Sequence, residues 1–195
     1  MTVMKKYLIS PEKKQYKANL HCHSVLSDGC KKPEELKEMY KSHGYSILAI
    51  TDHDNLASTS RAVVLGQRYG IRVLPAVEIS AVDTQRGKKV HILCYMPKKP
   101  DRLEGLCLRT CESRKQRGKQ MALKVMEKYP IALENIVRYA AGGKAIYKCH
   151  IMHALMDYGY TTELYGEVAN QEIDEILGDG ALRDAYAEEL KDKID

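Results

Sequence analysis

Two of the chain's seven histidines stand one residue apart, in the stretch ANLHCHSVLSD at residues 18–28. If this stretch is a strand, successive side chains point to opposite faces, so His21 and His23 share one face and Cys22 points away. Two neutral imidazoles on one face can bind a single borderline metal ion. A pair of surface histidines on an edge strand would look the same, so the rest of the chain has to decide between the two.

Further side chains that can bind a metal lie on the other predicted strands or directly after them. They are Asp28, Asp52, His53, Asp54, Glu78 and His91. Parallel β/α architectures gather their active sites at the carboxyl ends of the strands, so residues far apart in the sequence can converge there. We therefore expect a site in which histidines and carboxylates bind metal together.

Each of these residues, taken alone, has a second explanation. Asp28 can be a turn residue in LSDG, and Asp54 is predicted to cap the following helix. His91 can be a histidine of the core. Glu78 is different, because burying a carboxylate in the apolar run VLPAVEIS is costly unless the carboxylate is paired or bound to a cation. The joint pattern therefore favours a metal site.

The elements that must position these residues alternate between strands and helices in the first half of the chain. Pro33 suits the start of a helix and Gly44 its end. A second helix is expected over residues 58–70, and short strands are expected over residues 16–24, 45–50, 71–80 and 88–96. Strand–helix–strand order with continuous apolar strands predicts an α/β fold with a parallel sheet or barrel.

The second half changes character after PKKP at residues 97–100, which suits a linker. Helices are expected over residues 102–129, 132–143, 150–160 and 167–177, and the tail suits a charged helix. GKAIYKC at residues 143–149 is a candidate fifth strand. We therefore expect two parts: a β/α portion over residues 1–98 that carries the metal-binding motifs, and a helical portion over residues 99–195.

The composition is that of an ordinary globular chain of 195 residues, with 44% hydrophobic and 29% charged residues. A net charge of +5 favours anionic substrates but does not establish nucleic-acid binding. No run approaches the roughly 18 apolar residues of a membrane span. The start MTVMKKYLIS lacks the apolar core of a signal peptide, so we expect a cytoplasmic protein with no membrane partner. Its six cysteines are then expected to be reduced.

Taken together, H-x-H-S, S-D-G, A-I-T-D-H-D, E-I-S and a downstream V-H-I, all within residues 18–95, resemble the PHP (polymerase and histidinol phosphatase) superfamily. The resemblance implies a PHP-type distorted β/α barrel, here partial, that holds two or three divalent metal ions (Mn, Zn or Fe) for phosphoester hydrolysis. It implies metal ligation by His21, His23, Asp28, His53, Glu78 and His91, with Asp52 supporting these ligands from behind.

A second resemblance lies beyond residue 100. ESRKQRGKQM and HIMHALMDYGY are similar to the helical insertion of a PHP subgroup that removes phosphate from nucleoside 3′,5′-bisphosphates and trims short 5′-phosphorylated RNA. This implies that His150 is a further metal ligand, although the chain has Y-K-C-H where the subgroup usually has G-R-P-H. Arg114 and Arg117 match the substrate-facing helix, which implies contact with a substrate phosphate. A solvated basic face is the alternative for both arginines.

Residue chemistry and resemblance lead to the same reaction. Clustered divalent ions lower the pKa of a bridging water, which supplies metal-bound hydroxide near neutral pH, so no protein nucleophile is needed. We expect a phosphoesterase, either a phosphatase or a nuclease, that acts on small nucleotides or short 5′-phosphorylated oligonucleotides. The alternatives are a histidinol-phosphate-type phosphatase and a non-catalytic PHP module that only binds metal.

One feature of the subgroup is missing from the sequence. The resemblance implies an Asp-x-His pair on a late barrel strand, but no histidine follows His153. Four clear strands are expected, whereas the barrel of the superfamily has seven. We therefore expect a shortened form or a fragment, whose open barrel edge is covered by its own helices or by a second chain, as in a homo-oligomer.

Overall fold

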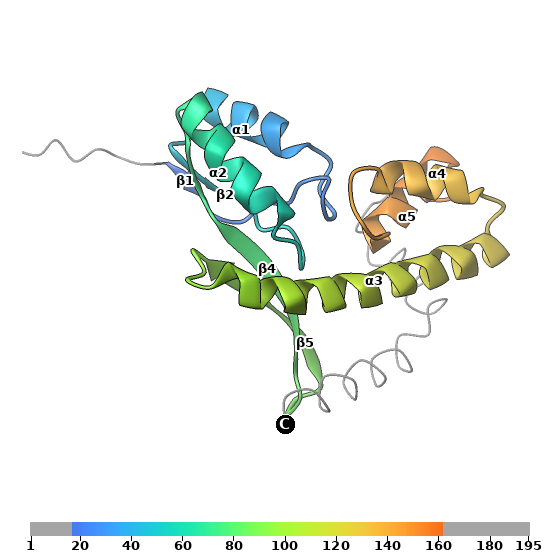
Figure 1. Ribbon diagram of the computed structural model, residues 1–195. Helices are drawn as coiled ribbons and strands as arrows, with labels where there is room; N and C mark the ends of the chain where they lie inside the picture. The colour runs from blue at the N-terminus through green and yellow to red at the C-terminus, as the bar shows by residue number, and fades with distance from the viewer. Residues whose placement is uncertain (1–16, 162–195) are drawn as a thin grey trace, which may run out of the picture.

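The computed structural model describes residues 17–161, which form a β/α part followed by a helical part (Figure 1). Three short strands form one sheet in the order β1 (Ala18–Asn19), β2 (Ile47–Ala49) and β3 (Arg72–Leu74). Neighbouring strands of this sheet pair in parallel. The parallel sheet expected from the strand–helix–strand order is therefore confirmed.

Two helices make the crossovers between these parallel strands. α1 (Pro33–Ser42) connects β1 to β2, and α2 (Ala57–Tyr69) connects β2 to β3. Pro33 is the first residue of α1, as expected, because its missing N–H has no helical partner at that position. The apolar core of this part consists of Leu36, Leu48, Ile50, Ala62, Ile71 and Val73. Gly70 ends α2 with a φ of +65°, which glycine adopts without strain.

The strand expected over residues 71–80 is wrong as a single element. Pro75 divides it into β3 and β4 (Ala76–Asp83), and β4 pairs with β5 (Lys88–Tyr95) in a separate antiparallel hairpin. Proline has no N–H for a ladder of hydrogen bonds, so it marks the point at which the pairing changes. The short turn around Gly87, which has a φ of +61°, returns the chain in the antiparallel direction.

The first strand and the candidate fifth strand also differ from expectation. β1 ends at Asn19, so His21 and His23 lie in the loop beyond it rather than on a strand face. Residues 143–149 do not form a strand, because they run through bends and a loop into α5, which begins at Lys148. Within residues 17–161 the chain has five strands, of which three belong to the parallel sheet.

The helical part begins with α3 (Pro100–Lys128), a helix of 29 residues that confirms the long helix expected after PKKP. The short α4 (Leu133–Val137), the 3-10 helix η1 (Arg138–Ala140) and α5 (Lys148–Asp157) follow it. Their shared core consists of Met121, Ala122, Val125, Ile131, Ile136, Ile151, Met152, Ala154 and Leu155. Figure 1 shows α4 and α5 together at the C-terminal half of α3. The helix expected over residues 167–177 and the charged tail lie outside the described residues.

The two parts meet at the loop that carries Asp28. Gly142 and Gly143 approach this loop so closely that an added Cβ would lie 3.0 Å from Cγ2 of Val25 and 3.2 Å from its carbonyl oxygen, respectively. The Cys149 thiol donates to the carbonyl oxygen of Asp28 across 3.6 Å. The helical part therefore rests directly on a loop that is expected to bind metal.

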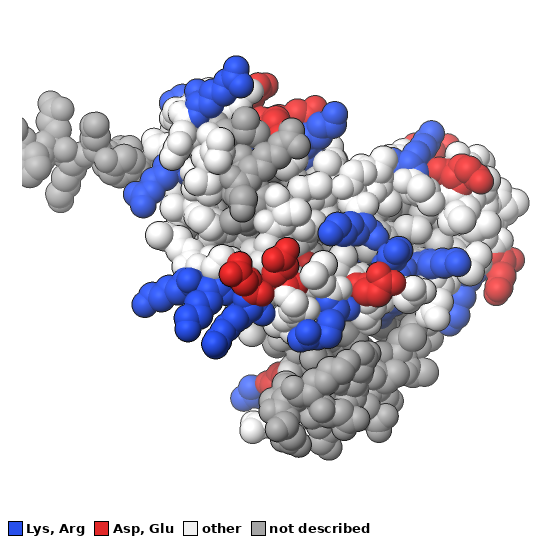
Figure 2. All heavy atoms as spheres, viewed as in Figure 1, with Lys and Arg blue, Asp and Glu red and all other residues white. Residues whose placement is uncertain are grey.

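The surface carries a mixture of charges. Figure 2 shows basic and acidic side chains side by side on one face of the molecule, with a group of Lys and Arg near the start of α3. This mixture agrees with the small net charge of +5. Among residues 17–161, no helix has the length and apolar character that a membrane crossing requires.

Candidate metal centre

Four histidines and two carboxylates that stand far apart in the sequence lie together in the structure. They form three overlapping groups, within each of which the potential ligand atoms lie within 4.8 Å of one another. The groups are His21, His23 and Glu78; His23, Asp28 and His53; and His53, Glu78 and His91. These are the six residues that the motifs of the first half predict as metal ligands.

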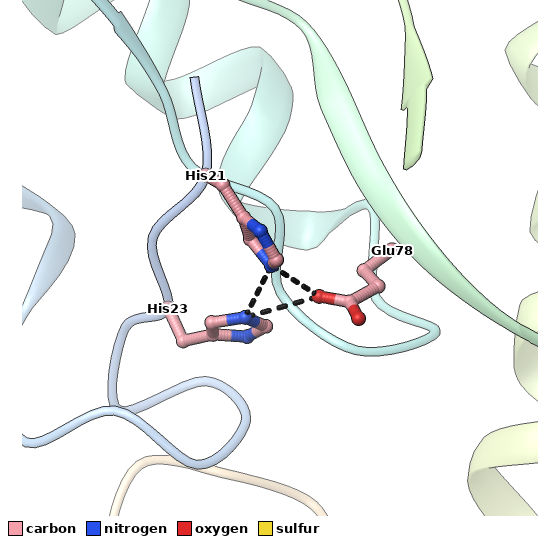
Figure 3. Close-up of side chains that lie close together, drawn as sticks. All are labelled: His21, His23 and Glu78. Carbon is pink, nitrogen blue, oxygen red and sulfur yellow. Dashed lines mark hydrogen bonds and ion pairs between the residues drawn. The ribbon is translucent and has the colours of Figure 1, made fainter. Parts of the chain in front are cut away.

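Glu78 lies among the histidines, with only 4% of its side chain exposed. Its Oε2 atom lies 2.8 Å from Nε2 of His21 and 3.0 Å from Nε2 of His23 (Figure 3). Its other oxygen, Oε1, lies 2.6 Å from Nδ1 of His91. A carboxylate whose two oxygens face different histidines has the geometry to bridge two cations.

The β4–β5 hairpin explains how Glu78 meets His91. In the antiparallel register Glu78 is opposite Leu93, and His91 is opposite Ser80. Residues two apart on a strand share a face, so Glu78 and His91 are diagonal neighbours on the same face of the hairpin. An isolated parallel bridge between His53 and Glu78 brings the chain after β2 against β4. The site thus lies where the parallel sheet and the hairpin meet.

Asp28 joins His23 and His53 on another side of the cluster. Its Oδ1 lies 3.1 Å from Nδ1 of His23, and its Oδ2 lies 3.5 Å from Nε2 of His53. Burial alone would raise the pKa of Asp28, but its contacts with the two histidines hold that pKa well below the ordinary range. Burial would lower the pKa of His23, but Asp28 and Glu78 raise it above 6.5. The pKa of Glu78 is also lowered, because the surrounding histidines outweigh its burial.

Asp52 lies behind the cluster and shapes the loop between His23 and Asp28. It is fully buried, and its Oδ1 accepts hydrogen bonds from the Ser24 N–H and the Ser27 hydroxyl, each at 2.7 Å. Its Oδ2 accepts the Ser24 hydroxyl at 2.7 Å. The motifs H-x-H-S and S-D-G contain both serines, but only the fold shows that their hydroxyls are bound to Asp52.

The predicted helix-capping role of Asp54 is wrong. Asn55 accepts the N–H of Ala57 at 2.9 Å at the start of α2, and Asp54 does not. Asp54 instead adopts a φ of +49° and accepts two hydrogen bonds from Ser80 and one from Arg114. The capping rule considers only neighbours in the sequence, whereas both donors to Asp54 come from distant segments.

His150 is buried but belongs to none of the three groups. Its Nδ1 accepts the N–H of Tyr147 at 3.1 Å, which leaves Nε2 as the ring nitrogen that could bind a metal. The Tyr147 ring lies between two histidines, with its centroid 5.5 Å from that of His150 and 5.9 Å from that of His53. The role of His150 as a ligand therefore stays a prediction, and Tyr147 is a residue of the site that sequence reasoning did not single out.

A cavity of about 110 Å³ opens beside His91, between the hairpin and α3. Arg117 and Lys89 line it with positive charge, Ser113 contributes a hydroxyl, and Arg114 lines it while paired with Asp54. Positive charge on a cavity wall attracts anionic ligands. Both arginines that the second resemblance associates with a substrate phosphate thus lie next to a candidate metal ligand.

The donor atoms of this cluster of histidines and carboxylates suit a metal ion. Nδ1 of His53 is buried and has no hydrogen-bond partner among residues 17–161. An unpaired buried polar atom is costly, and a bound cation would satisfy it. Imidazole and carboxylate donors together suit Mn, Zn and Fe better than Mg. The donor set therefore supports divalent metal binding.

Comparison with known proteins agrees with this geometry. The family profile described as PHP domain matches residues 19–188. The chain belongs to the PHP domain family. The match covers the metal-binding motifs and extends through the helical part, which confirms the resemblance stated from the motifs.

Relatives of this PHP chain have names that refer to phosphoester chemistry. It is 31% identical over 177 residues to a phosphoribosyl 1,2-cyclic phosphate 1,2-diphosphodiesterase of Eggerthella lenta, covering 85% of the chain and 68% of the relative. It is 34% identical over 151 residues to the 5′-3′ exoribonuclease Rnm of Escherichia coli, covering 75% and 50%. It is 29% identical over 149 residues to a 3′,5′-nucleoside bisphosphate phosphatase of Chromobacterium violaceum, covering 75% and 51%.

Solved structures share the fold of the PHP chain. A protein from Bifidobacterium adolescentis, described as a metal-dependent phosphoesterase, superimposes with a TM-score of 0.69 at 26% identity, over 82% of the chain and 55% of that protein. An amidohydrolase from Chromobacterium violaceum superimposes with a TM-score of 0.66 at 29% identity, over 75% and 52%. The chain thus spans about half to two thirds of the length of these relatives.

Proposed function

We propose that this PHP chain is a metal-dependent phosphoesterase that hydrolyses phosphate esters of small nucleotides or short 5′-phosphorylated oligonucleotides. One observation carries the proposal: Glu78 is a buried carboxylate whose two oxygens face different histidines. Such an arrangement suits more than one cation at neighbouring positions. The names of the relatives support the same class of reaction.

Two or three divalent ions of Mn, Zn or Fe would occupy the three overlapping groups of ligands, with His150 as a further candidate. When bound, they would activate a water molecule and withdraw negative charge from the phosphoryl group. The residues of the chain hold the site in shape. Asp28 and Glu78 keep ring nitrogens of the histidines facing inward, and Asp52 fixes the loop that carries Asp28.

The two serine hydroxyls beside the histidines are not arranged to attack a phosphoryl group. The Ser27 hydroxyl lies 3.5 Å from Nδ1 of His23, but it donates to Asp52 at 2.7 Å. Ser24 also donates to Asp52, and both serines are fully buried. Their role is therefore to hold the loop, which supports water as the nucleophile.

A phosphorylated, anionic substrate suits the basic cavity beside His91, where Arg117 and Lys89 contribute to the wall. The relatives are named for a ribosyl cyclic phosphate, for nucleoside bisphosphates and for RNA, and each of these is a phosphate ester that contains ribose or a nucleoside. We also propose the division into a metal-binding part over residues 1–98 and a helical part from residue 99, since each part has an apolar core of its own.

A non-catalytic metal-binding module is the second candidate. The chain spans 50% to 68% of the length of its enzyme relatives. In this case the protein would bind metal but release no phosphate on its own, and a second chain in a homo-oligomer would have to complete the site.

Release of inorganic phosphate from adenosine 3′,5′-bisphosphate separates these functions. The protein is reconstituted with Mn²⁺, its mass is measured by light scattering, and histidinol phosphate is tested in parallel. Turnover of the bisphosphate that Glu78→Gln abolishes would support the proposal. Bound metal without phosphate release from either substrate would support the module, and faster release from histidinol phosphate would favour a histidinol-phosphate-type enzyme.

A further inference from the structure

Asp54 holds the strand that carries Glu78 at two points. Its backbone N–H donates to the Glu78 carbonyl oxygen at 2.9 Å, and its Oδ1 accepts the Ser80 N–H at 2.9 Å. Its Oδ2 accepts the Ser80 hydroxyl at 2.7 Å. Because Asp54 directly follows His53, these contacts tie the position of one candidate ligand to that of another.

The contacts of Asp54 require an uncommon backbone conformation. Its φ of +49° lies in the left-handed region, which residues other than glycine seldom adopt. Its side chain is 1% exposed, so its charge is also removed from water. Strain and burial of this kind persist only where the surrounding contacts compensate them. The hydrogen bonds from β4 and the contact with Arg114 supply that compensation.

Arg114 supplies the counter-charge from the helical part. Its Nη2 donates to Oδ2 of Asp54 at 2.7 Å. Its guanidinium carbon lies 5.0 Å from the ring centroid of Tyr147, and the Tyr147 ring stacks on the His53 ring at 24°. Arg114 therefore connects helix α3 to the candidate metal centre by two routes, one through Asp54 and one through Tyr147.

We infer that Asp54 is a positioning residue of the metal centre, which sets the place of Glu78 relative to His53, and that Arg114 holds it there from helix α3. The inference rests on the proposed metal centre. Neither residue is assigned to the metal itself, since the carboxylate oxygens of Asp54 are bound by Ser80 and Arg114. Loss of the charge at Asp54 is therefore expected to displace a ligand without removing one.

The test measures metal binding itself and does not depend on enzyme activity. Mn²⁺ affinity and the absorption spectrum of bound Co²⁺ are recorded for the wild type, Asp54→Asn and Arg114→Gln. Each variant is expected to bind Mn²⁺ about 10- to 100-fold more weakly and to change the Co²⁺ spectrum, because residues that orient metal ligands have effects of this size. The double variant is expected to lose little more than either single one, because the two residues act as a pair.

Asp83→Asn is the matched control. Asp83 also pairs with an arginine, Arg86, at 2.9 Å, but this pair lies at the exposed turn of the hairpin. The control is expected to bind both ions as the wild type does. If Asp54→Asn does not fold, Arg114→Gln and Ser80→Ala decide the question, since Ser80→Ala removes no charge and only the two hydrogen bonds of the Ser80 hydroxyl, which donates to Asp54 and accepts from Arg114.

Two results would overturn the inference. One leaves the proposed metal centre intact, and the other removes it. If the variants lower the melting temperature but leave the Mn²⁺ affinity and the Co²⁺ spectrum unchanged, Asp54 has only a structural role and the metal centre stands. If the wild type binds neither ion, the proposed metal centre fails and the inference fails with it.

Discussion

Nδ1 of His91 lies 2.6 Å from Oε1 of Glu78, although a hairpin turn separates the two residues in the sequence. The Glu78 side chain is 4% exposed, whereas that of His91 is 48% exposed and lines the basic cavity. This pair therefore lies at the border between the interior of the protein and a space that an anionic ligand can enter.

Glu78→Gln is expected to abolish metal binding and phosphate release while the fold remains. Glutamine keeps the shape of the side chain but lacks the negative charge that would hold cations between the histidines. When both proteins are free of metal, the free energy of unfolding is expected to differ by only about 1 kcal/mol, because the amide can still form hydrogen bonds. Elemental analysis, a phosphate assay and urea unfolding measure the three quantities. Glu112→Gln, at an exposed carboxylate of α3, is the control. Near-wild-type turnover of Glu78→Gln would show that Glu78 has only a structural role.

The purified protein is expected to contain more than one transition-metal ion per chain. Six candidate ligands in three groups are too many for one tetrahedral ion. Removal of the metal with a chelator is expected to lower the melting temperature, because ions that bind only the folded state stabilise it. Elemental analysis after purification without added metal gives the stoichiometry. A metal-free protein that takes up neither Mn²⁺ nor Zn²⁺ would contradict the metal centre.

The pair of Asp28 and His23 is expected to stabilise the metal-free protein in a defined pH window. The folded-state pKa of His23 lies above 6.5, so its contribution is complete below pH 6.5 and is lost as the pH rises through that pKa. The pKa of Asp28 lies below 3.8, so its contribution is complete above pH 3.8 and is lost as the pH falls through the lowered pKa. The difference in free energy of unfolding between the wild type and Asp28→Asn should therefore be largest between pH 3.8 and 6.5. Urea unfolding of both proteins inside and outside this pH window tests the prediction. A difference in free energy of unfolding that does not change with pH would contradict it.

Gly118 is expected to tolerate no larger residue. A Cβ at this position of α3 would lie 2.3 Å from the carbonyl oxygen of Ile146, so Gly118→Ala should destabilise the protein. The expected cost is about 1–3 kcal/mol, because the backbone has to move. Gly105→Ala on the same helix is the control, since its Cβ would approach only the end of the flexible Arg109 side chain, at 3.8 Å. There alanine should stabilise the helix by about 0.5–1 kcal/mol. Equal effects of the two changes in urea unfolding would contradict this packing.

Three thiols, that of the half-buried Cys22 and those of the buried Cys107 and Cys149, are expected to resist alkylation. Burial raises the pKa of Cys22 and Cys149 to about 12 and that of Cys107 to about 11. Because the thiolate is the reactive form, iodoacetamide at mildly alkaline pH should modify the exposed Cys30 first and these three thiols only after denaturation. Mass spectrometry of the digested protein gives the order. Rapid modification of Cys149 would show that the helical part opens away from the Asp28 loop.

The candidate ligands could be predicted from the sequence because each has a distinctive local context. His53 lies a few residues beyond a short apolar strand, and Glu78 is a lone carboxylate in an apolar run. Helix boundaries were predictable for a similar reason: α1 begins at Pro33, and α3 ends just before Pro130. Features of this kind depend on residues within a few positions of one another, and the sequence contains that information directly.

Pairing between strands could not be predicted in this way. The periodicity of residues 76–95 indicates strands but does not say which strands they join. Pro75 interrupts the parallel sheet, and the turn at Gly87 then returns the chain against β4. The antiparallel hairpin that brings His91 to Glu78 therefore depends on two local features acting together.

Asp54 shows what the tertiary structure alone decided. Local rules assign it to the start of α2, but its carboxylate accepts hydrogen bonds from Ser80 and Arg114, which stand 26 and 60 positions away. A buried polar group must find partners because leaving it unpaired is costly. Those partners come within hydrogen-bonding distance only once distant segments of the chain have packed together.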